Sequence, residues 1–366
     1  MNTHKPKRFR EDEKLEVTEI GDGNLNVVLR VSGDNNKSII VKHSLPYIKC
    51  LGEGYPLGEQ RIDIEYKALS KFHTLSPGSV PEPYAFDKPN NAVYMEDLHG
   101  YKMLRGSLMD GIFDLTLSDT IGRHLGTVHR DTHVSTVGDD GIKTLTEEFD
   151  NSNMVVLHEE FVFTRPLNRT DPTNKCSTEV SKRLDSLYDD ERVVAAINAM
   201  LDVFKTKKEC LLHGDLHTGS IMFSGSDIRL MDIEFAHIGA ASFDVGILVA
   251  HFIFSYFRHM SLDDTHKNFA YMMVDACKRF VSTYLQYMTA YTGDRKTYIK
   301  NFMSETAGFA GCEIVRRCVG AAHNADVEDL PDAEVDCLGA GVRLLHVYQK
   351  IHDIDRLLVI AFMLTI

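Results

Sequence analysis

Two short segments of this 366-residue sequence carry the side chains best suited to catalysis. In the first, His213–Met222, Asp215 lies between two histidines on a loop that also contains glycine. In the second, Leu230–Phe235, Asp232 and Glu234 flank a single residue at the end of an expected strand. Because positions i and i+2 of an extended chain project to the same face, these two carboxylates could hold one hard cation through oxygen ligands.

Taken one at a time, these residues carry little information. An aspartate in a turn is usually a turn residue or a helix cap, and a lone histidine is more often a hydrogen-bonded structural residue than a catalyst. The combination is more specific, because phosphoryl transfer needs one carboxylate that orients a substrate hydroxyl and others that hold Mg²⁺ on the nucleotide phosphates. The pattern therefore predicts Asp215 as the base and Asp232 and Glu234 as metal ligands.

A glycine-containing segment near the start of the sequence could contribute to a nucleotide site. Gly21–Asn26 leads into the first expected strand, and its glycines would let the backbone approach phosphate groups without a Cβ in the way. The segment lacks the spacing of a Walker loop. Alone, it is equally consistent with a simple hairpin turn.

Together these motifs resemble those of the methylthioribose kinases, a family of the aminoglycoside and choline kinase-like phosphotransferases. His213–Met222 reads HGDLHTGSIM, which is the family's sequence without a change, and Asp232–Ala236 matches the family pattern D-x-E-F-A. Further matching segments are the nucleotide loop Glu19–Asn26, the lysine segment Ile40–Tyr47, the hinge Met95–Leu98, Phe243–Gly246 and Arg316–Asp326. The resemblance covers roughly residues 17–326, and the ordered set is more specific than any one motif.

The resemblance implies ATP and Mg²⁺ as cofactors and assigns residues to the nucleotide. Lys42 is implied to pair with the α- and β-phosphates, and Glu65 on the following helix to hold Lys42 in place, with Asp63 as the alternative partner. The backbone of residues 96–98 would face the adenine edge. The complete set of residues expected at the cofactor is Gly23, Asn26, Lys42, Glu65, Glu96, Asp97, Leu98, Asp232, Ile233 and Glu234.

The acceptor substrate is implied to contact Asp215 and at least one of two arginines, Arg316 and Arg317. Adjacent residues on a helix point about 100° apart, so one of the pair is not simply solvated. The alternative for the pair is a salt bridge to Glu313 or a surface position. Arg316 is the favoured substrate contact.

The sequence departs from related patterns at two positions. Tyr55, in the segment Gly52–Leu57, stands where the family has a tryptophan on a loop that would act as a lid. Ser220 stands where protein kinases place an asparagine as a second metal ligand, five residues after the catalytic aspartate. We expect Glu234 to offset the missing amide oxygen.

The function implied by the resemblance is transfer of the γ-phosphoryl group of ATP to the 1-hydroxyl of 5-methylthioribose, which gives the 1-phosphate in methionine salvage. A kinase for another hydroxylated small molecule, of the aminoglycoside, choline or homoserine type, is the alternative among enzymes. A non-catalytic nucleotide-binding pseudokinase is the alternative outside them, although Lys42, Asp215 and the two metal-binding carboxylates are all present. A protein kinase is disfavoured, since HGD and DIE stand in place of HRD and DFG.

These residues require a scaffold of two kinds of structure. The first hundred residues predict strands at Leu25–Val31, Ser38–Val41 and Ala92–Met95 and a helix at Ile62–Phe72. The remainder predicts strands at Ile221–Phe223 and Ile228–Met231 and helices at Ser118–Arg130, Val180–Tyr188, Glu191–Lys207, Phe243–His259, Asp263–Thr292, Arg295–Ala322 and Ala333–Leu364. We expect an α+β, two-lobed, protein-kinase-like fold, with a β-rich nucleotide-binding lobe over residues 1–95, a hinge at 96–100, and a helical lobe with the catalytic loop and substrate site over 101–366.

The composition excludes several classes of protein. With 40 basic and 53 acidic residues the net charge is −13, which makes nucleic acids and anionic membranes unfavourable partners. The seven cysteines form no CxxC pair, which argues against a disulfide framework or a structural zinc site. No apolar run reaches the ~20 residues of a membrane span, and residues 1–10 lack the apolar core of a secretory signal. We expect a cytoplasmic protein that binds ATP and a small sugar-like substrate, and the resemblance implies a homodimer.

Overall fold

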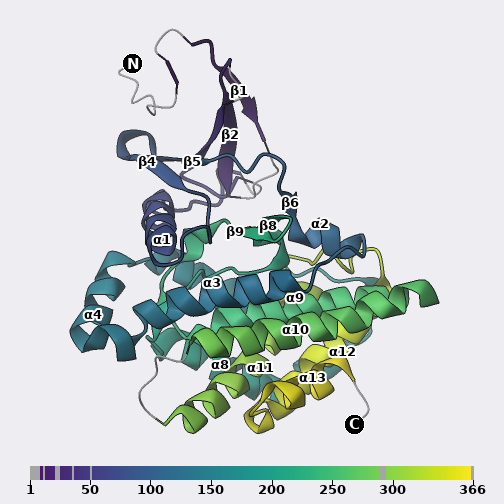
Figure 1. Ribbon diagram of the computed structural model, residues 1–366. Coiled ribbons are helices and arrows are strands. Elements are labelled where there is room, and N and C mark those ends of the chain that lie inside the picture. Colours follow the sequence, from purple (N-terminus) through teal and green to yellow (C-terminus); the bar gives the residue numbers. More distant parts are fainter. Residues whose placement is uncertain are drawn as a thin grey trace.

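The computed structural model describes residues 9–10, 13–20, 25–34, 37–49, 52–288 and 294–363. A small lobe built on an antiparallel sheet lies against a larger helical lobe, and the chain passes from one to the other after residue 96 (Figure 1). This is the two-lobed, protein-kinase-like fold expected from the sequence.

The small lobe consists of one five-stranded sheet, with the strand order β1-β2-β3-β5-β4, and one helix. Its elements are β1 (Glu16–Glu19), β2 (Asn26–Ser32), β3 (Ser38–Ser44), α1 (Arg61–Leu75), β4 (Pro83–Asp87) and β5 (Ala92–Glu96). The expected hairpin is confirmed, because β2 and β3 pair from Asn26 opposite Ser44 to Ser32 opposite Ser38. The expected helix and third strand are confirmed as α1 and β5, whereas β1 and β4 were not expected.

The alternation of side chains along β3 directs Lys42 toward α1. Ile40 and Lys42 are both buried and share one face of the sheet, since successive residues of a strand point to opposite faces. The helix α1 packs against β3, β4 and β5, and it also contacts residues 233–235 of the large lobe. This helix therefore joins the sheet to the segment that carries the second pair of carboxylates.

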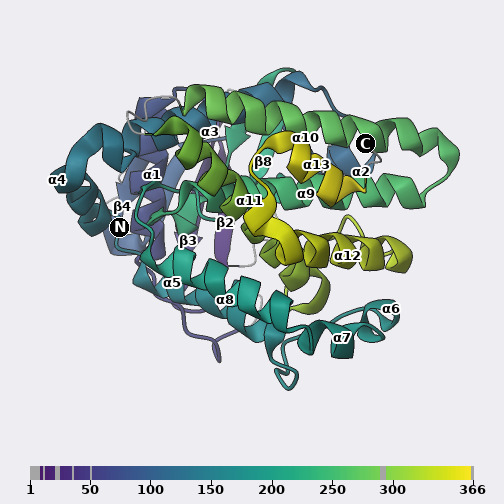
Figure 2. The same ribbon diagram turned by 90° about the horizontal axis from the view of Figure 1, so that it is seen from below.

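The large lobe is built around α9 (Ala241–Ser261), which is buried along nearly its whole length. It packs against α10, α11 and α12, as the view from below shows (Figure 2). In addition to α9, the lobe's helices are α2 (Leu104–Met109), α3 (Thr116–Thr132), α4 (Val134–Glu148), α5 (Ser152–His158), α6 (Thr178–Ser181), α7 (Leu184–Tyr188), α8 (Glu191–Thr206), α10 (Lys267–Tyr287), α11 (Arg295–Val319), α12 (Pro331–Val347) and α13 (Ile354–Phe362). Within the described ranges, none of the helices is long and apolar enough to cross a membrane.

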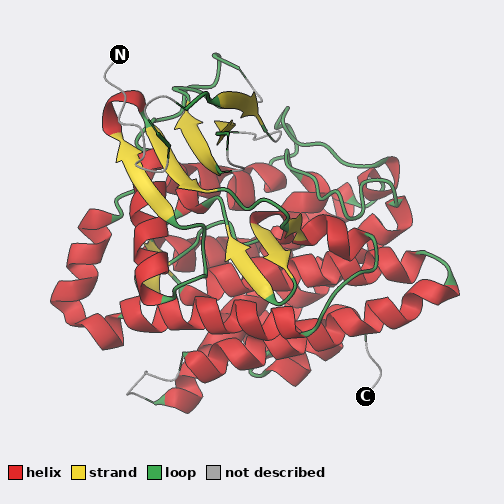
Figure 3. Ribbon diagram, turned by 45° about the horizontal axis from the view of Figure 1, so that its top comes forward, coloured by secondary structure: helices red, strands yellow, loops and turns green. Residues whose placement is uncertain are grey.

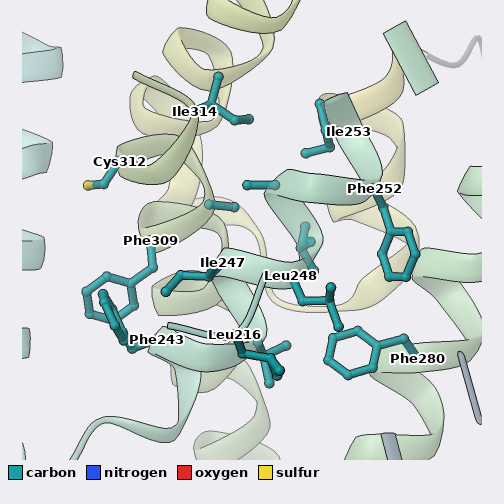
Figure 4. Packing of buried hydrophobic residues seen from close by; sticks show 14 of the residues in the cluster. Leu216, Phe243, Ile247, Leu248, Phe252, Ile253, Phe280, Phe309, Cys312 and Ile314 are labelled. Atoms are coloured by element: carbon teal, nitrogen blue, oxygen red, sulfur yellow. The ribbon is translucent and has the colours of Figure 1, made fainter. Parts of the chain in front are cut away.

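The apolar core around α9 also anchors the loop at residues 212–220. Figure 4 shows Leu216 of this loop among Phe243, Ile247 and Leu248 of α9, and its side chain is fully buried. Gly246 lets α9 and α11 approach closely, because a Cβ there would lie 2.9 Å from the carbonyl oxygen of Thr306. The 212–220 loop is thus packed onto the buried core of the lobe.

Two small sheets hold the segments that carry the acidic residues. One pairs β7 (Cys210–Leu211) with β10 (Ile238–Gly239), and the other has the order β6-β8-β9, formed by Lys102–Met103, Ile221–Ser224 and Asp227–Leu230. Figure 3 shows the β8–β9 hairpin between the N-terminal sheet and the helices. The 212–220 loop runs from β7 to β8, and residues 231–237 run from β9 to β10, so the same two sheets fix both segments at both ends.

Three expected helices differ from those observed. The expected helix at 180–188 forms two short helices, α6 and α7, and the one at 333–364 is interrupted after α12. The side chain of Asp353 accepts a hydrogen bond from the backbone of Arg356 and so begins α13 as a separate helix. The helix expected from residue 263 begins at Lys267, because Asp263 caps a preceding 3-10 turn, and residues 289–292 of that prediction lie outside the described residues.

Candidate active site

The 212–220 loop is braced by the hydroxyl of Ser220. This hydroxyl donates to the carbonyl oxygen of Asp215 at 2.9 Å and accepts from the backbone N–H of His217 at 2.9 Å. The backbone carbonyl of Ser220 in turn accepts from Met231 at 2.8 Å, which ties the loop to the segment with the other two carboxylates. Ser220, which the sequence comparison with protein kinases placed at a metal-ligand position, is buried and bonded to the loop itself.

A buried aspartate on α9, Asp244, holds the beginning of the loop. Its two oxygens accept from the backbone N–H groups of His213 at 2.7 Å and Gly214 at 2.9 Å, and His129 approaches one of them at 3.2 Å. Burial raises the pKa of Asp244, but the hydrogen bond from His129 and these N–H groups bring it below its ordinary value. No role for Asp244 was predicted, although the segment Phe243–Gly246 belonged to the matching motifs.

Gly214 occupies a position that only glycine fits well. Its φ is +88°, and a Cβ would lie 2.3 Å from the carbonyl oxygen of Phe235. Gly225, in the β8–β9 turn, has a φ of +58° but no atom within 4 Å of its Cβ position. A side chain at Gly225 would meet only the unfavourable backbone conformation, whereas one at Gly214 would also meet the close contact. Substitutions at the two positions therefore separate these two energetic costs.

We expect Gly214→Ala to lower the free energy of unfolding by about 2–4 kcal/mol and to reduce turnover, because the loop must move away from Phe235. Gly225→Ala is the matched control and should cost only about 1 kcal/mol, with turnover unchanged. Urea unfolding and initial rates measure both effects. Equal losses in the two variants would contradict the importance of the contact with Phe235.

Lys42 brings together three carboxylates from both lobes. Its Nζ lies 2.8 Å from an oxygen of Glu65 on α1, 2.8 Å from Asp232 and 3.8 Å from Glu234. Burial lowers the pKa of Lys42, but the three carboxylates raise it well above its ordinary value, so the ammonium stays charged. Of the two acidic residues considered as its partner, Glu65 makes this contact, whereas Asp63 pairs with Lys67 on the surface of the same helix.

The charged form of Glu65 is disfavoured by its burial. Burial raises its pKa to about 7, although Lys42 acts in the opposite direction. One of its two carboxylate oxygens is buried without a hydrogen-bond partner among the described residues. Its ionisation therefore depends on the ammonium group of Lys42.

Arg61, which sequence reasoning missed, fixes Glu234 against the small lobe. This arginine is only 2% exposed. Its Nε lies 3.2 Å from Glu234, and the Nδ2 of Asn26 donates to the same carboxylate oxygen at 2.8 Å. The Nη1 and Nη2 of Arg61 donate to the carbonyl oxygens of residues 25, 45 and 58. Asn26, expected at the nucleotide, thus also links the lobes.

The segment around Asp232 differs from the extended strand end that the sequence suggested. The strand β9 ends at Leu230, Asp232 has a left-handed φ of 60°, and Glu234 lies in a 3-10 turn at Ile233–Phe235. The carboxylates still meet at Lys42, because the turn and the positive φ of Asp232 redirect both side chains toward its ammonium group. Asp232 remains 53% exposed, whereas Glu234 is buried.

The residues expected at the hinge form the connection between the lobes. Glu96 ends β5, and the carboxylate of Asp97 accepts from Arg30 of β2 at 2.7 and 3.0 Å. Leu98 is buried, and its carbonyl oxygen accepts from Tyr101 at 3.1 Å. Ile233, expected beside Asp232 at the cofactor, is also fully buried. Gly23, expected in the nucleotide loop, lies outside the described residues.

Asp215 lies beside positive charge from α11. The Nη2 of Arg316 is 3.7 Å from one of its oxygens, and His217 is 3.4 Å from the other. Burial opposes the charged form, but His217, Arg316 and Arg317 hold the pKa of Asp215 well below its usual range. The carboxylate is therefore ionised at neutral pH.

The two adjacent arginines share one buried partner, Glu313. The Nη2 of Arg316 donates to it at 3.1 Å and the Nε of Arg317 at 2.8 Å. The salt bridge to Glu313 that the sequence left open is therefore present, and it does not remove Arg316 from Asp215.

Tyr55, on the segment that replaces the tryptophan loop, is 46% exposed.

In the described part of the chain, no three His, Cys, Asp or Glu side chains are grouped as a metal site would require. Of the three carboxylates at Lys42, Asp232 and Glu234 are the two that the sequence predicts as metal ligands. The half-exposed carboxylate of Asp232 is open to a cation, and this donor chemistry suits Mg²⁺.

Comparisons with known proteins place these features in context. A family model described as the phosphotransferase enzyme family matches residues 16–267. Curated methylthioribose kinases from Bacillus cereus (strain 03BB102) and Bacillus anthracis are each 33% identical over 362 residues, which cover 95% of this chain and 91% of theirs. Among solved structures, a choline kinase from Cryptosporidium parvum Iowa II is 15% identical, with a TM-score of 0.49 over 94% of this chain and 90% of that one.

Proposed function

Because the chain belongs to the phosphotransferase enzyme family, and within it to the methylthioribose kinases, we propose that it transfers the γ-phosphoryl group of ATP to the 1-hydroxyl of 5-methylthioribose. The product would be 5-methylthioribose 1-phosphate, an intermediate of methionine salvage. The choice of acceptor is based on the relatives named methylthioribose kinase, whose similarity extends over 95% of this chain.

The observation that carries the proposal is the convergence of both lobes on Lys42. A buried ammonium that contacts Glu65 from one lobe and Asp232 from the other is the arrangement that phosphoryl transfer needs at the nucleotide phosphates. Lys42 would contact the α- and β-phosphates, and Glu65 would hold it in place. The backbone of residues 96–98 would receive the adenine edge.

Asp232 and Glu234 would hold Mg²⁺. When bound, the metal would neutralise charge on the transferred phosphoryl group and on the phosphates that remain. The side chains of this chain supply the rest: Arg61 and Asn26 fix Glu234, and Lys42 fixes Asp232.

Asp215 would act on the acceptor. Since the transition state of phosphoryl transfer is loose, the carboxylate mainly orients the substrate hydroxyl and accepts its proton late. Its low pKa suits this role, because it remains ionised until the proton leaves the hydroxyl. Arg316 and Arg317 would contact the sugar hydroxyls or the transferred phosphoryl group.

The acceptor is tested by an ADP-release assay with methylthioribose beside ribose, choline, homoserine and an aminoglycoside. We expect methylthioribose to give the highest kcat/KM. Turnover of choline without turnover of methylthioribose would end this proposal, and nucleotide binding without turnover of any acceptor would indicate a pseudokinase.

The metal role of Glu234 is tested by titrating Mg²⁺ at fixed ATP. Glu234→Gln is expected to raise the Mg²⁺ concentration for half-maximal rate about 10-fold, which corresponds to about 1.4 kcal/mol of binding energy. Gln keeps the size of the side chain beside Arg61, and Glu234→Ala removes it. An unchanged apparent Mg²⁺ affinity in both variants would show that Glu234 only links the lobes.

Three further properties belong to the proposal. Residues 1–95 would form the nucleotide-binding lobe, 96–100 the hinge, and 101–366 the lobe with the substrate site. The enzyme would work in the cytoplasm as a homodimer. Its binding partners would be ATP and the sugar substrate, with no role for nucleic acid or membrane.

A further inference from the structure

Two charged residues close to the 212–220 loop have no part in the mechanism above. Asp326 follows α11 and is fully buried, and neither of its carboxylate oxygens has a hydrogen-bond partner among the residues described. The Nε of Arg105, from α2, lies 3.7 Å from one of these oxygens. Asp326 therefore supplies the counter-charge that holds one side of the Arg105 guanidinium.

The other side of the Arg105 guanidinium rests on the 212–220 loop. Its Nη2 lies 3.4 Å from the Nδ1 of His217, and its central carbon would be 2.8 Å from a Cβ at Gly219. A glycine at that position thus makes room for the arginine. Arg105 reaches the loop and Asp326 with two different nitrogens at once.

The contact with Arg105 determines which nitrogen of His217 carries the proton. A guanidinium has only donors and does not lose its proton in proteins, so the Nδ1 of His217 must accept. In the neutral ring the hydrogen is then on Nε2, the nitrogen that lies 3.4 Å from Oδ2 of Asp215. The imidazole is therefore a donor toward the proposed base.

The two oxygens of Asp215 consequently have different surroundings. Oδ2 faces the N–H of His217, whereas Oδ1 is buried without a hydrogen-bond partner in the described part of the chain, with Arg316 at 3.7 Å. The histidine thus addresses one oxygen only, which fixes the rotation of the carboxylate. His217 is itself held in place by the Ser220 hydroxyl at its backbone and by the ring of His251, 5.3 Å away.

We propose that Arg105, anchored by Asp326, is a positioning residue that fixes the Nε2–H tautomer of His217, so that His217 donates to Oδ2 of Asp215 and orients the carboxylate toward the acceptor. The inference rests on the proposed role of Asp215 as the base. It adds three residues, Arg105, Asp326 and His217, to the acceptor side of the site.

The first test observes the tautomer directly and needs no activity. Long-range ¹H–¹⁵N spectra of protein labelled at histidine, with His217 identified from its absence in His217→Gln, should show the Nε2–H form alone. In Arg105→Met the signal should shift toward a mixture of tautomers. If Arg105→Met does not fold, Arg105→Lys replaces it, since one ammonium keeps the charge beside Asp326 but cannot reach His217 at the same time. An unchanged Nε2–H signal would overturn the proposal.

The second test is a double-mutant cycle in kcat. Arg105→Met and His217→Phe are each expected to lower kcat about 10–100-fold, with the KM for ATP unchanged, and the double variant should be no worse than His217→Phe alone. His217→Gln, whose amide can still donate to Asp215, should recover most of the rate. Multiplicative effects of Arg105 and His217 would show that the arginine does not act through the histidine.

A comparison of Arg105→Met with Asp215→Asn distinguishes this inference from the proposed function. If Asp215→Asn abolishes turnover while Arg105→Met has no effect, the proposed action of Arg105 through His217 is wrong, and the role of Asp215 stands. If Asp215→Asn is fully active, Asp215 is not the base, and the positioning role of Arg105 is contradicted as well.

Discussion

Replacing Asp215 with asparagine is expected to lower kcat by about 10²–10⁴-fold while the fold and the affinity for ATP stay nearly unchanged. Asparagine has the same shape and can still receive the N–H of His217 on its oxygen. It cannot take the proton of the acceptor hydroxyl, and it removes the negative charge that faces Arg316 at 3.7 Å. Initial rates and calorimetric titration with a non-hydrolysable ATP analogue measure the two effects separately.

The matched control for this prediction is Asp139→Asn, at an exposed position of α4. This variant should keep the wild-type rate. Full activity of Asp215→Asn would show that the reaction centre lies elsewhere. A loss of ATP affinity as large as the loss of kcat would assign Asp215 to the nucleotide rather than to the acceptor.

Replacing Lys42 with methionine is expected to lower kcat/KM for ATP by about 10²–10³-fold, the effect of removing one preorganised positive group from a phosphoryl site. The same change should destabilise the fold by about 3–5 kcal/mol at pH 8, because buried Glu65 and Glu234 lose the ammonium between them. Initial rates over a range of ATP concentrations and urea unfolding measure these effects.

The stability effect of Lys42→Met should depend on pH with a definite sign. The pKa of Glu65 is about 7 in the folded protein, above the 4.5 of an ordinary glutamate, so this group favours the folded state at low pH and loses that contribution as pH rises through 7. Without Lys42 the folded pKa rises further. The gap in unfolding free energy between the variant and the wild type is therefore expected to widen from pH 5 to pH 8.

A second substitution checks that Glu65 is the cause. Lys42→Met combined with Glu65→Gln removes the titrating carboxylate, so the pH dependence of the stability gap should largely disappear while activity stays low. A gap that is the same at pH 5 and pH 8 in Lys42→Met alone would contradict this account of the buried pair.

Features that depend on neighbours in sequence could be predicted well. The β2–β3 hairpin follows from two β-branched runs around a turn cluster, and α1 and α9 follow from apolar residues at helical spacing. The two-residue strands β7 and β10 could not be found in this way, because so few residues carry no periodicity. Their effect is large nonetheless, since they fix the ends of both acidic segments.

Features that depend on distant partners escaped sequence reasoning. Asn26 and Glu234 are 208 positions apart, and Arg61 is distinguished from other helix-starting arginines only by its burial between them. In the sequence, Asp244 is simply an acidic residue in an apolar helix. Its role becomes visible only in the structure, where it accepts a hydrogen bond from the backbone N–H of His213. The extended conformation predicted at Asp232 was also wrong, because the sequence contains no signal for a positive φ at a residue other than glycine.

The buried contact of Arg61 with Glu234 constrains how the enzyme can open. The lobes are covalently joined near Leu98, and Arg61 and Asn26 of the small lobe contact Glu234 of the large lobe. The ion pair of Lys42 with Asp232 is a further non-covalent link between them. A sliding or twisting motion between the lobes would therefore first have to break a salt bridge that is shielded from water.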